Sequence, residues 1–215
     1  MPRSQQPASG RFISIEGGEG AGKSTTIAYL QASLTAAQIP VVVTREPGGT
    51  AIGERIRDIL LHPQDAAMAH DTELMLMFAA RAEHLQKVIL PAIGRGEWVI
   101  CDRFTDATYA YQGAGRGIPE QRIAVLEKWV QGGFEPDMTI LFDLPVDLGL
   151  QRAGTRGDLD RFEQEQRSFF DAVRECYRER AARYPDRFRI VDASRTLDGD
   201  RSQLDLLIAE LTGLT

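Results

Sequence analysis

The sequence predicts an α/β fold in which a five-stranded, mostly parallel sheet is covered by helices on both faces, giving a three-layer sandwich. Two observations carry this prediction. Five short apolar runs alternate along the chain with longer segments of helical periodicity. A glycine-rich phosphate-binding pattern also stands directly between the first apolar run and the first helical segment.

The apolar runs are expected to form the strands. They occupy Phe12–Glu16, Val41–Thr44, Trp98–Asp102, Met138–Asp143 and Phe188–Asp192. The helical patterns occupy Gly22–Ala37, Ile52–Leu61, Thr72–Ile93, Glu120–Val130 and Arg161–Arg183. Ligands of such sheets bind beyond the carboxyl ends of the strands, so the loops that follow the first three runs are expected to meet at one edge.

Composition indicates one soluble domain over residues 12–215, preceded by a flexible polar tail over residues 1–11. The net charge of −6 argues against sequence-independent binding to a nucleic acid polymer or an anionic membrane. No apolar run approaches the roughly 20 residues that span a bilayer. Cys101 and Cys176 form no disulfide framework or zinc spacing, so both are expected to be buried, reduced thiols of a cytoplasmic protein.

Residues 17–24 fit the phosphate-binding pattern G-x-x-x-x-G-K-[ST] at every fixed position. Glycines let successive backbone N–H groups face one anion, and the N-terminus of the following helix adds partial positive charge. Lys23 is expected to reach the β- and γ-phosphates, and the Ser24 hydroxyl to bind Mg²⁺. The alternative is a glycine-rich turn without a ligand. The strand and helix that flank the pattern disfavour it, so the chain is predicted to bind a nucleoside triphosphate.

The third strand run ends in Asp102, and Arg103 follows it. A carboxylate at this position can hold Mg²⁺ through water or accept a hydrogen bond from a substrate. An arginine fork suits bidentate contact with a phosphate that a second substrate already carries. The alternative interpretation of the two residues is a local surface ion pair.

The helix predicted over Thr72–Ile93 carries a stripe of large side chains that includes a charge. Its members are Leu74, Phe78, Arg81, Leu85 and Val88. An arginine on an apolar stripe is unfavourable unless it is paired, and an aromatic ring one turn away suits a flat base. The alternatives are that Phe78 is plain core and that Arg81 snorkels from the end of the stripe. Thr108 and Gln112 are four residues apart, so on a short helix they share one face and could contact the edge of a base.

A third basic cluster consists of Arg152, Arg156 and Arg161 around Gly154 and Gly157. Glycine-bracketed arginines before a helix are typical of a mobile lid, here about residues 150–162. The phosphate loop has no cation beyond Lys23, and an inserted arginine can increase the rate of phosphoryl transfer by roughly 10³–10⁵. The lid is therefore the expected source of that charge. The alternative is a solvated charge run with acidic partners.

Taken together, these motifs resemble the bacterial thymidylate kinases, and they occur in the order of that family from Phe12 onward. The matching strings are IEGGEGAGKSTT (15–26), TREPGGT (44–50), CDRF (101–104), TYAYQGAGRG (108–117), RGDLDRFEQE (156–165) and VDAS (191–194). The resemblance implies a P-loop fold like that of the nucleoside-monophosphate kinases. It also implies transfer of the γ-phosphoryl group of ATP to dTMP, with Mg²⁺ as cofactor, in a homodimer.

The resemblance also implies a role for each matching residue. Residues expected in catalysis are Lys23, Arg156, Arg103, Asp102 and Glu19, with Ser24 and Asp102 beside the metal. ATP is expected to contact Gly17, Gly18, Glu19, Gly20, Ala21, Gly22, Lys23, Ser24, Thr25, Arg152 and Arg161. The acceptor dTMP is expected to contact Glu46, Pro47, Arg57, Met77, Phe78, Arg81, Arg103, Thr108 and Gln112. The family often places its stacking aromatic four residues before the base-reading arginine. Met77 stands there in this chain, which leaves open whether Met77 or Phe78 covers the base.

Two other functions remain open at this point. The first is another P-loop kinase of nucleosides or nucleoside monophosphates. The second is a nucleotide-binding switch that hydrolyses its ligand slowly. The N-K-x-D pattern that reads guanine is missing from the sequence, and a second phosphorylated substrate explains the arginines better.

Overall fold

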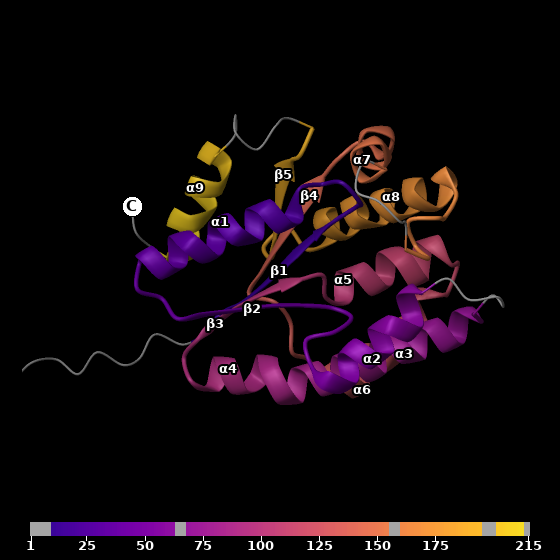
Figure 1. Ribbon diagram of the computed structural model, residues 1–215, viewed down its shortest axis with the longest axis horizontal. Helices are drawn as coiled ribbons and strands as arrows, with labels where there is room; N and C mark the ends of the chain where they lie inside the picture. The colour runs from indigo at the N-terminus through magenta and orange to yellow at the C-terminus, as the bar shows by residue number, and fades with distance from the viewer. Residues whose placement is uncertain (1–9, 63–67, 155–159, 195–200, 213–215) are drawn as a thin grey trace, which may run out of the picture.

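The computed structural model describes residues 10–62, 68–154, 160–194 and 201–212 (Figure 1). Residues 1–9 of the predicted tail and residues 155–159 of the predicted lid, including Arg156, lie outside the described residues. None of the helices within the described ranges is long and apolar enough to cross a membrane. Cys101 and Cys176 are both free and buried, as predicted.

One parallel sheet of five strands forms the middle layer, in the order β2-β3-β1-β4-β5. The strands are β1 (Phe12–Gly17), β2 (Val41–Arg45), β3 (Trp98–Asp102), β4 (Met138–Asp143) and β5 (Phe188–Asp192). All five predicted strands are therefore confirmed, with one further residue at the end of β1 and of β2. Asp102 pairs in register with Ile15 on one side and with Arg45 on the other, so the carboxyl ends of the first three strands meet at one edge.

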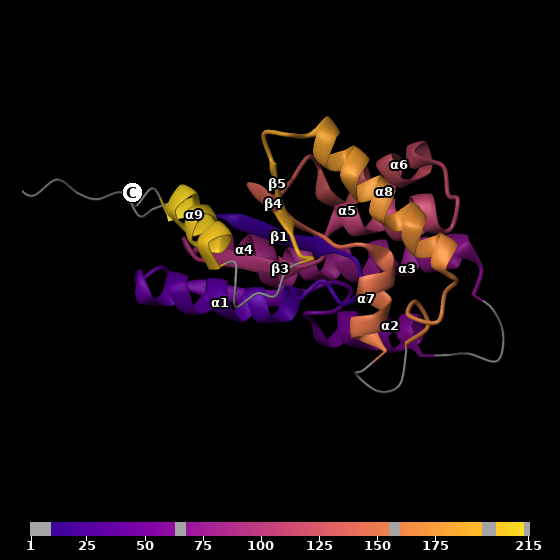
Figure 2. The ribbon, with the colours of Figure 1, turned by 90° about the horizontal axis from the view of Figure 1, so that it is seen from above.

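Helices cover both faces of this sheet. They are α1 (Lys23–Ala36), α2 (Ala51–Leu61), α3 (His70–His84), α4 (Leu90–Gly94), α5 (Thr105–Thr108), α6 (Glu120–Gln131), α7 (Val146–Ala153), α8 (Arg167–Arg183) and α9 (Arg201–Thr212), with π-helical turns η1 (Leu85–Ile89) and η2 (Tyr109–Gly115). One core cluster packs α1 and α9 against Ile13, Ile15 and Phe142 of the sheet. Figures 1 and 2 show α9 beside α1. The opposite face packs against η1, α4, η2 and α8.

The helix predicted over Thr72–Ile93 is interrupted by the π turn η1, which separates α3 from α4. Pro91 has no N–H to donate to the preceding turn, and a π turn just before it absorbs the irregularity. The extra residue also rotates the apolar stripe by one position. Ile89 is therefore fully buried, whereas Val88, which the helical period assigned to the stripe, is only half-buried.

The helix predicted over Arg161–Arg183 begins later, at Arg167. Residues 161–164 form turns instead, because the Asp160 carboxylate accepts hydrogen bonds from the backbone N–H groups of Phe162 and Glu163 at 2.8 and 2.9 Å. Apart from the short α5–η2 helix that carries Thr108 and Gln112, two helices of the described residues lie outside the predicted segments. One is α7, which follows Pro145 and occupies the start of the predicted lid. The other is α9, which completes the core beside α1.

Candidate active site

A cavity of about 680 Å³ lies at the edge where the first three strands end. Its walls come from the phosphate loop, the loop after β2, helix α3, the end of β3, the α5–η2 helix and the segments around the lid. The residues that line it include Glu19, Gly20, Ala21, Gly22, Lys23, Ser24, Thr25, Glu46, Pro47, Arg57, Met77, Arg81, Asp102, Arg103, Thr108, Tyr111, Gln112 and Arg152. A cleft of this size is typical of small-molecule sites.

The phosphate loop connects β1 to α1, with Gly22 in the left-handed region (φ 83°) just before the helix begins at Lys23. Gly20 also has a positive φ of 69°, and a Cβ at this position would lie 2.3 Å from the carbonyl oxygen of Gly149 in α7. Only glycine fits such a position. Lys23 is buried, and its Nζ donates to the carbonyl oxygens of Gly17 and Gly18 at 3.2 and 3.0 Å.

The charge of Lys23 is in an unfavourable environment. Burial, reinforced by the positive charge of Arg103, lowers the pKa of the Lys23 ammonium. A polyphosphate bound at the loop would offset both effects, because it places negative charge against the same ammonium group. Together with the backbone N–H groups at the start of α1, Lys23 forms an anion site.

Arg103 follows β3 in the left-handed region, with φ 69°. Its guanidinium donates to the carbonyl oxygen of Gly17 at 3.0 Å and to the Glu19 carboxylate at 2.5 Å, and it lies 4.7 Å from the ring centre of Tyr111. The Tyr111 hydroxyl donates to the same Glu19 carboxylate at 3.0 Å. Arg103 therefore pairs with the adjacent phosphate loop, and the predicted alternative of a local pair with Asp102 is wrong.

Asp102 is half-buried at the end of β3, and its Oδ1 is buried without a hydrogen-bond partner among the described residues. The Ser24 hydroxyl lies in the wall of the same cavity, at the first turn of α1. A carboxylate oxygen and a hydroxyl are ligands of the kind that Mg²⁺ accepts when substrate phosphates complete its coordination. These two residues fit a Mg²⁺ ion.

Arg81 is buried on α3, and its Nε donates to Glu46 at 2.7 Å while its Nη2 donates to the Thr108 hydroxyl at 2.9 Å. Glu46 also contacts the ring Nδ1 of His84 at 2.9 Å, and the other ring nitrogen contacts the Thr44 hydroxyl at 2.7 Å. The third guanidinium nitrogen, Nη1, has no hydrogen-bond partner within the described ranges. The snorkelling alternative is wrong, because the guanidinium of Arg81 is buried and hydrogen-bonded in the interior, where Arg81 forms part of the cavity wall.

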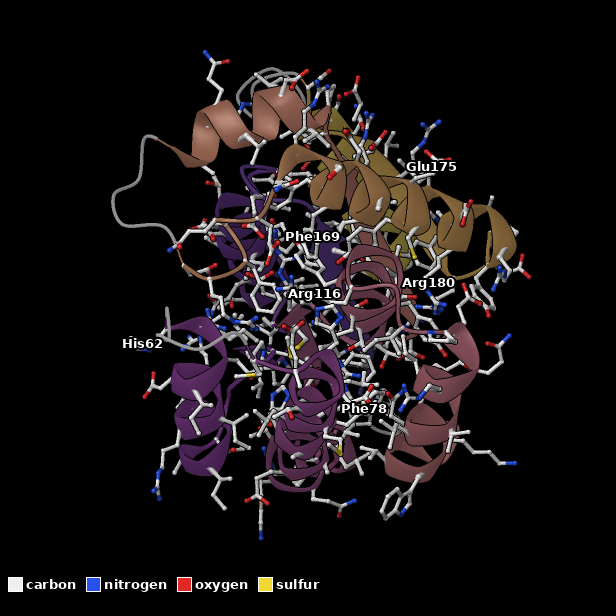
Figure 3. The ribbon with its side chains drawn as sticks, turned by 90° about the vertical axis from the view of Figure 1, so that its right-hand side faces the viewer. His62, Phe78, Arg116, Phe169, Glu175 and Arg180 are labelled. Atoms are coloured by element: carbon white, nitrogen blue, oxygen red, sulfur yellow. The ribbon has the colours of Figure 1, made fainter. Side chains whose placement is uncertain are left out.

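Phe78 and Met77 take different places. Phe78, which Figure 3 labels, is part of the core, and its ring centre lies 4.9 Å from the guanidinium Cζ of Arg81. It is not among the residues that line the cavity, whereas Met77 is. The structure therefore places the thioether of Met77, not the ring of Phe78, at the cavity wall beside Arg81.

The remaining predicted residues are divided between the cavity and its surroundings. Pro47, Thr25, Arg57 and Arg152 line the cavity, and Arg57 donates to the Pro47 carbonyl at 2.9 Å. Arg161 does not line it: its guanidinium donates to the Leu60 carbonyl at 2.7 Å and pairs with Glu73. Gly17 and Gly18 lie behind the cavity, where their carbonyl oxygens hold Lys23.

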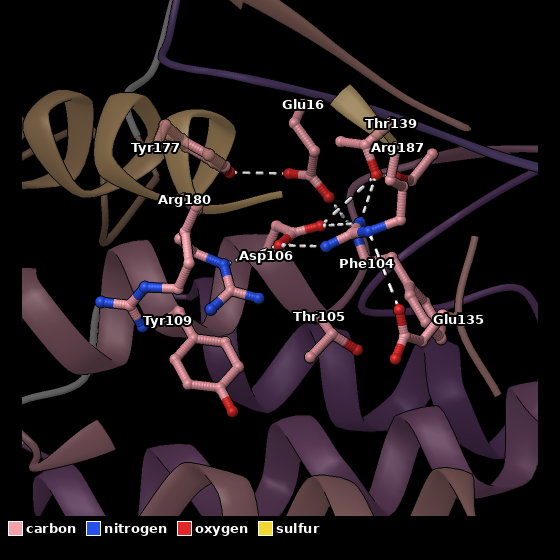
Figure 4. A network of polar contacts seen from close by, with 12 residues as sticks. Glu16, Phe104, Thr105, Asp106, Tyr109, Glu135, Thr139, Tyr177, Arg180 and Arg187 are labelled. Atoms are coloured by element: carbon pink, nitrogen blue, oxygen red, sulfur yellow. Dashed lines mark hydrogen bonds and ion pairs between the residues drawn. The ribbon is translucent and has the colours of Figure 1, made fainter. Parts of the chain in front are cut away.

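Glu16 and Tyr177, which hold the base of the site, were not predicted from the sequence (Figure 4). Glu16 is fully buried; its Oε1 accepts from the backbone N–H of Phe104 and its Oε2 from the Tyr177 hydroxyl, both at 2.7 Å. Burial, reinforced by the charge of Asp106, raises the pKa of Glu16 to about 7. The sequence did contain a signal for Glu16, because a charged residue that ends an otherwise apolar strand run needs a partner if it is buried.

A second unpredicted cluster adjoins Glu16 and is centred on Asp106 (Figure 4). The Asp106 carboxylate accepts from Arg180 at 2.6 Å and from Arg187 at 2.6 Å, and Arg187 also donates to the Thr139 hydroxyl at 2.5 Å. Although burial alone would raise the pKa of Asp106, the two arginines lower it. The cluster ties α5 to α8, to β4 and to the segment just before β5.

Known proteins with similar sequences include thymidylate kinases. The family model described as "Thymidylate kinase" matches residues 15–202. The thymidylate kinase of Pseudomonas savastanoi pv. phaseolicola is 60% identical over 205 residues, which cover 95% of this chain and 98% of the relative. The thymidylate kinase of Alcanivorax borkumensis is 58% identical over 203 residues, which cover 94% and 98%.

A solved structure agrees with this result. The crystal structure of thymidylate kinase from Ehrlichia chaffeensis superimposes with a TM-score of 0.73 at 31% sequence identity, and the match covers 93% of this chain and 97% of that one. The sheet order, the phosphate loop and the cavity at the strand ends are thus found in a chain with the P-loop nucleoside-monophosphate-kinase fold. The chain belongs to the thymidylate kinase family of phosphotransferases.

Proposed function

We propose that the protein transfers the γ-phosphoryl group of ATP to dTMP, giving dTDP and ADP, within the cavity at the strand ends. Membership of the family and the phosphate loop support a kinase. In the cavity, Lys23 and Arg103 lie together at the phosphate loop, where both donate to the carbonyl oxygen of Gly17, and Arg57 lies beside Pro47 in the loop after β2. This arrangement suits two phosphorylated compounds that lie end to end, with transfer in line between them and no covalent enzyme intermediate.

Two buried polar atoms in the cavity wall support thymine as the base of the acceptor. Arg81 Nη1 is a donor and Gln112 Oε1 an acceptor, both buried and both without a hydrogen-bond partner among the described residues. Thymine presents the complementary pair along one edge, because its O4 accepts and its N3–H donates. Cytosine presents the reverse pair, so it would leave both protein atoms unsatisfied. Met77 adds a polarisable contact for the ring.

On the donor side, the phosphate loop and Lys23 bind the phosphates of ATP. Ser24 and Asp102 hold Mg²⁺, which when bound supplies positive charge to the phosphate oxygens. Lys23 and Arg103 place fixed, largely buried charges where negative charge accumulates during transfer.

On the acceptor side, Arg57 and Arg103 orient the phosphate of dTMP. Burial, together with the charge of Arg45, lowers the pKa of Arg57, so a bound anion at this position restores its preference for the charged form. The acceptor phosphate is already an anion near neutral pH, so the reaction needs no general base. Arg156 from the lid, outside the described residues, supplies the further charge on the migrating group.

The test is an ADP-release assay with dTMP, dUMP, dCMP, dGMP and thymidine as acceptors. We expect dTMP to be the best acceptor and dUMP to be slower, since contact with the thymine methyl group contributes about 1–3 kcal/mol. Thymidine should be inactive, because it carries no phosphate for the arginines. Faster reaction with another nucleotide would favour a different P-loop kinase, and ADP release that is independent of any acceptor would favour a nucleotide-binding switch.

We also propose that the protein is a cytoplasmic homodimer. Helix α3 packs between α2 and α6, and all three carry exposed apolar side chains. These are Ile52 and Ile59 of α2, Met75 of α3, and Val125 and Trp129 of α6. Trp129 is 81% exposed in the single chain. Exposed apolar side chains on three helices that pack side by side favour a self-association surface. Sedimentation should give a dimer for the wild type and a monomer for Trp129→Glu.

A further inference from the structure

Behind the cavity wall lies a fully buried carboxylate, that of Glu73 in α3. The amide nitrogen of Gln112 donates to its Oε1 at 2.8 Å. Arg116 donates from Nε to both carboxylate oxygens at 3.2–3.3 Å, and Arg161 Nη2 lies 2.7 Å from Oε2. The carboxylate is thus shared between one amide and two guanidinium groups.

The neighbours of the two arginines hold this arrangement in place. Arg116 also donates to Glu165 at 2.5 Å and lies 4.9 Å from the ring centre of Phe169 (Figure 3). Arg161 lies 4.6 Å from the ring centre of Phe162 and donates to the carbonyl of Leu60. Each guanidinium therefore has a stacking contact and a second acceptor, which fixes its position against Glu73.

The chemistry of these groups determines the orientation of the Gln112 amide. A carboxylate between two guanidinium groups only accepts hydrogen bonds, so the NH₂ end of Gln112 must face Glu73. The carbonyl end, Oε1, is then the atom that remains for a ligand. This agrees with its burial without a partner in the described part of the chain and with the place of Gln112 in the cavity wall.

We propose that Glu73 is a positioning residue that determines base specificity: it holds Gln112 with Oε1 toward the acceptor base, and so selects a ring N–H donor over a ring nitrogen acceptor. This inference rests on the proposed function, because it assigns the origin of discrimination between dTMP and dCMP. Glu73 itself touches neither substrate. Its effect passes through the amide of Gln112.

The variant Glu73→Gln tests this proposal with little change of shape. The two arginines are donors only, so they claim the oxygen of the substituted amide and leave its NH₂ toward Gln112. Gln112 must then turn its own oxygen to that NH₂ group and its own NH₂ to the base. We expect the ratio of kcat/KM for dTMP to that for dCMP to fall by a factor on the order of 10². Because both substrates are measured on one preparation, the ratio does not depend on the folded fraction.

The matched control is Glu165→Gln, which removes a carboxylate from the same arginine cluster without contact to Gln112. We expect its dTMP-to-dCMP ratio to stay within about twofold of the wild type. A ratio that is unchanged in Glu73→Gln, or that falls equally in both variants, would overturn the inference. Failure of the wild type to use dTMP would instead overturn the proposed function.

A measurement on the wild type does not depend on whether the variant folds. The side-chain amide signal of Gln112 in a nitrogen-15 NMR spectrum can be identified by its loss in Gln112→Ala. We expect its NH₂ protons to exchange slowly with solvent both before and after dTMP is added, because they are bonded to Glu73. Protection that appears only when dTMP is added would mean that the NH₂ faces the base, and would overturn the proposal.

Discussion

Glu16 gives the protein a dependence of stability on pH that one substitution should remove. Its pKa is raised to about 7 by burial and by the charge of Asp106, against 4.5 for an ordinary glutamate. A pKa difference of this size means that the folded protein favours the protonated over the charged form of Glu16 by roughly 3 kcal/mol more than the unfolded chain does. Because the folded state binds the proton more tightly than the unfolded state, this contribution is fully present below pH 4.5. It is lost as the pH rises to about 7.

The substitution is Glu16→Gln. A glutamine can still accept from the Phe104 N–H through its oxygen and donate to the Tyr177 hydroxyl through its NH₂, so the contacts are kept while the titration is removed. We expect the stability of the wild type to fall by about 3 kcal/mol relative to the variant between about pH 4.5 and pH 7.5. Groups that do not interact with Glu16 are common to both proteins and cancel in the difference. Asp106 does interact with it, but, against the effect of burial, Arg187 and Arg180 lower the pKa of Asp106, so it titrates below this window.

The assay is urea unfolding followed by circular dichroism at a series of pH values, with the free energy of unfolding extrapolated for each protein. The expected result is a difference between wild type and variant that changes by about 3 kcal/mol over the window and is constant above it. Parallel curves for the two proteins would refute the claim that Glu16 is buried in a protonated form near neutral pH.

Three further predictions concern the walls of the cavity. Lys23→Ala should lower kcat by about 10²–10³, since it removes a preorganised charge, and should leave the circular dichroism spectrum unchanged. A kcat within about tenfold of the wild type would contradict this role of Lys23. Gly20→Ala should weaken ATP binding by about tenfold in calorimetry, because Gly20 has a positive φ and the added Cβ would lie 2.3 Å from the carbonyl oxygen of Gly149. An unchanged affinity would show that the loop adapts freely. Phe78→Ala should destabilise the fold by about 3–5 kcal/mol, whereas Met77→Ala should raise KM for dTMP with a smaller loss of stability. The reverse pattern, measured by urea unfolding and initial rates, would place Phe78 on the base instead.

Local sequence patterns predicted the features of this molecule that depend on residues close together in the sequence. The five strands followed from apolar runs, and the meeting of the phosphate loop with Asp102 and Arg103 followed from the geometry of a parallel sheet. The unusual position of Arg81 on an apolar stripe also indicated that it must be paired, and the structure supplies Glu46 as the partner. In each case the informative signal lay within a few residues.

Contacts between distant segments could not be predicted in this way. Glu46 and Arg81 are 35 residues apart, and Gln112 and Glu73 are 39 apart, so no period or spacing connects them. The π turn before Pro91 shifts the apolar stripe by one residue, which a strict helical period cannot anticipate. The choice between Met77 and Phe78 depended on tertiary context as well, because neighbouring residues of one helix point in different directions.

Direct transfer requires that donor and acceptor occupy the cavity together, and calorimetry tests this requirement. dTMP is titrated into protein that has been saturated with Mg²⁺ and a non-hydrolysable ATP analogue. We expect uptake of one dTMP per chain, with an affinity within about tenfold of that measured without the analogue. Absence of binding, or displacement of the analogue by dTMP, would show that the two nucleotides compete for one site and would contradict direct transfer between them.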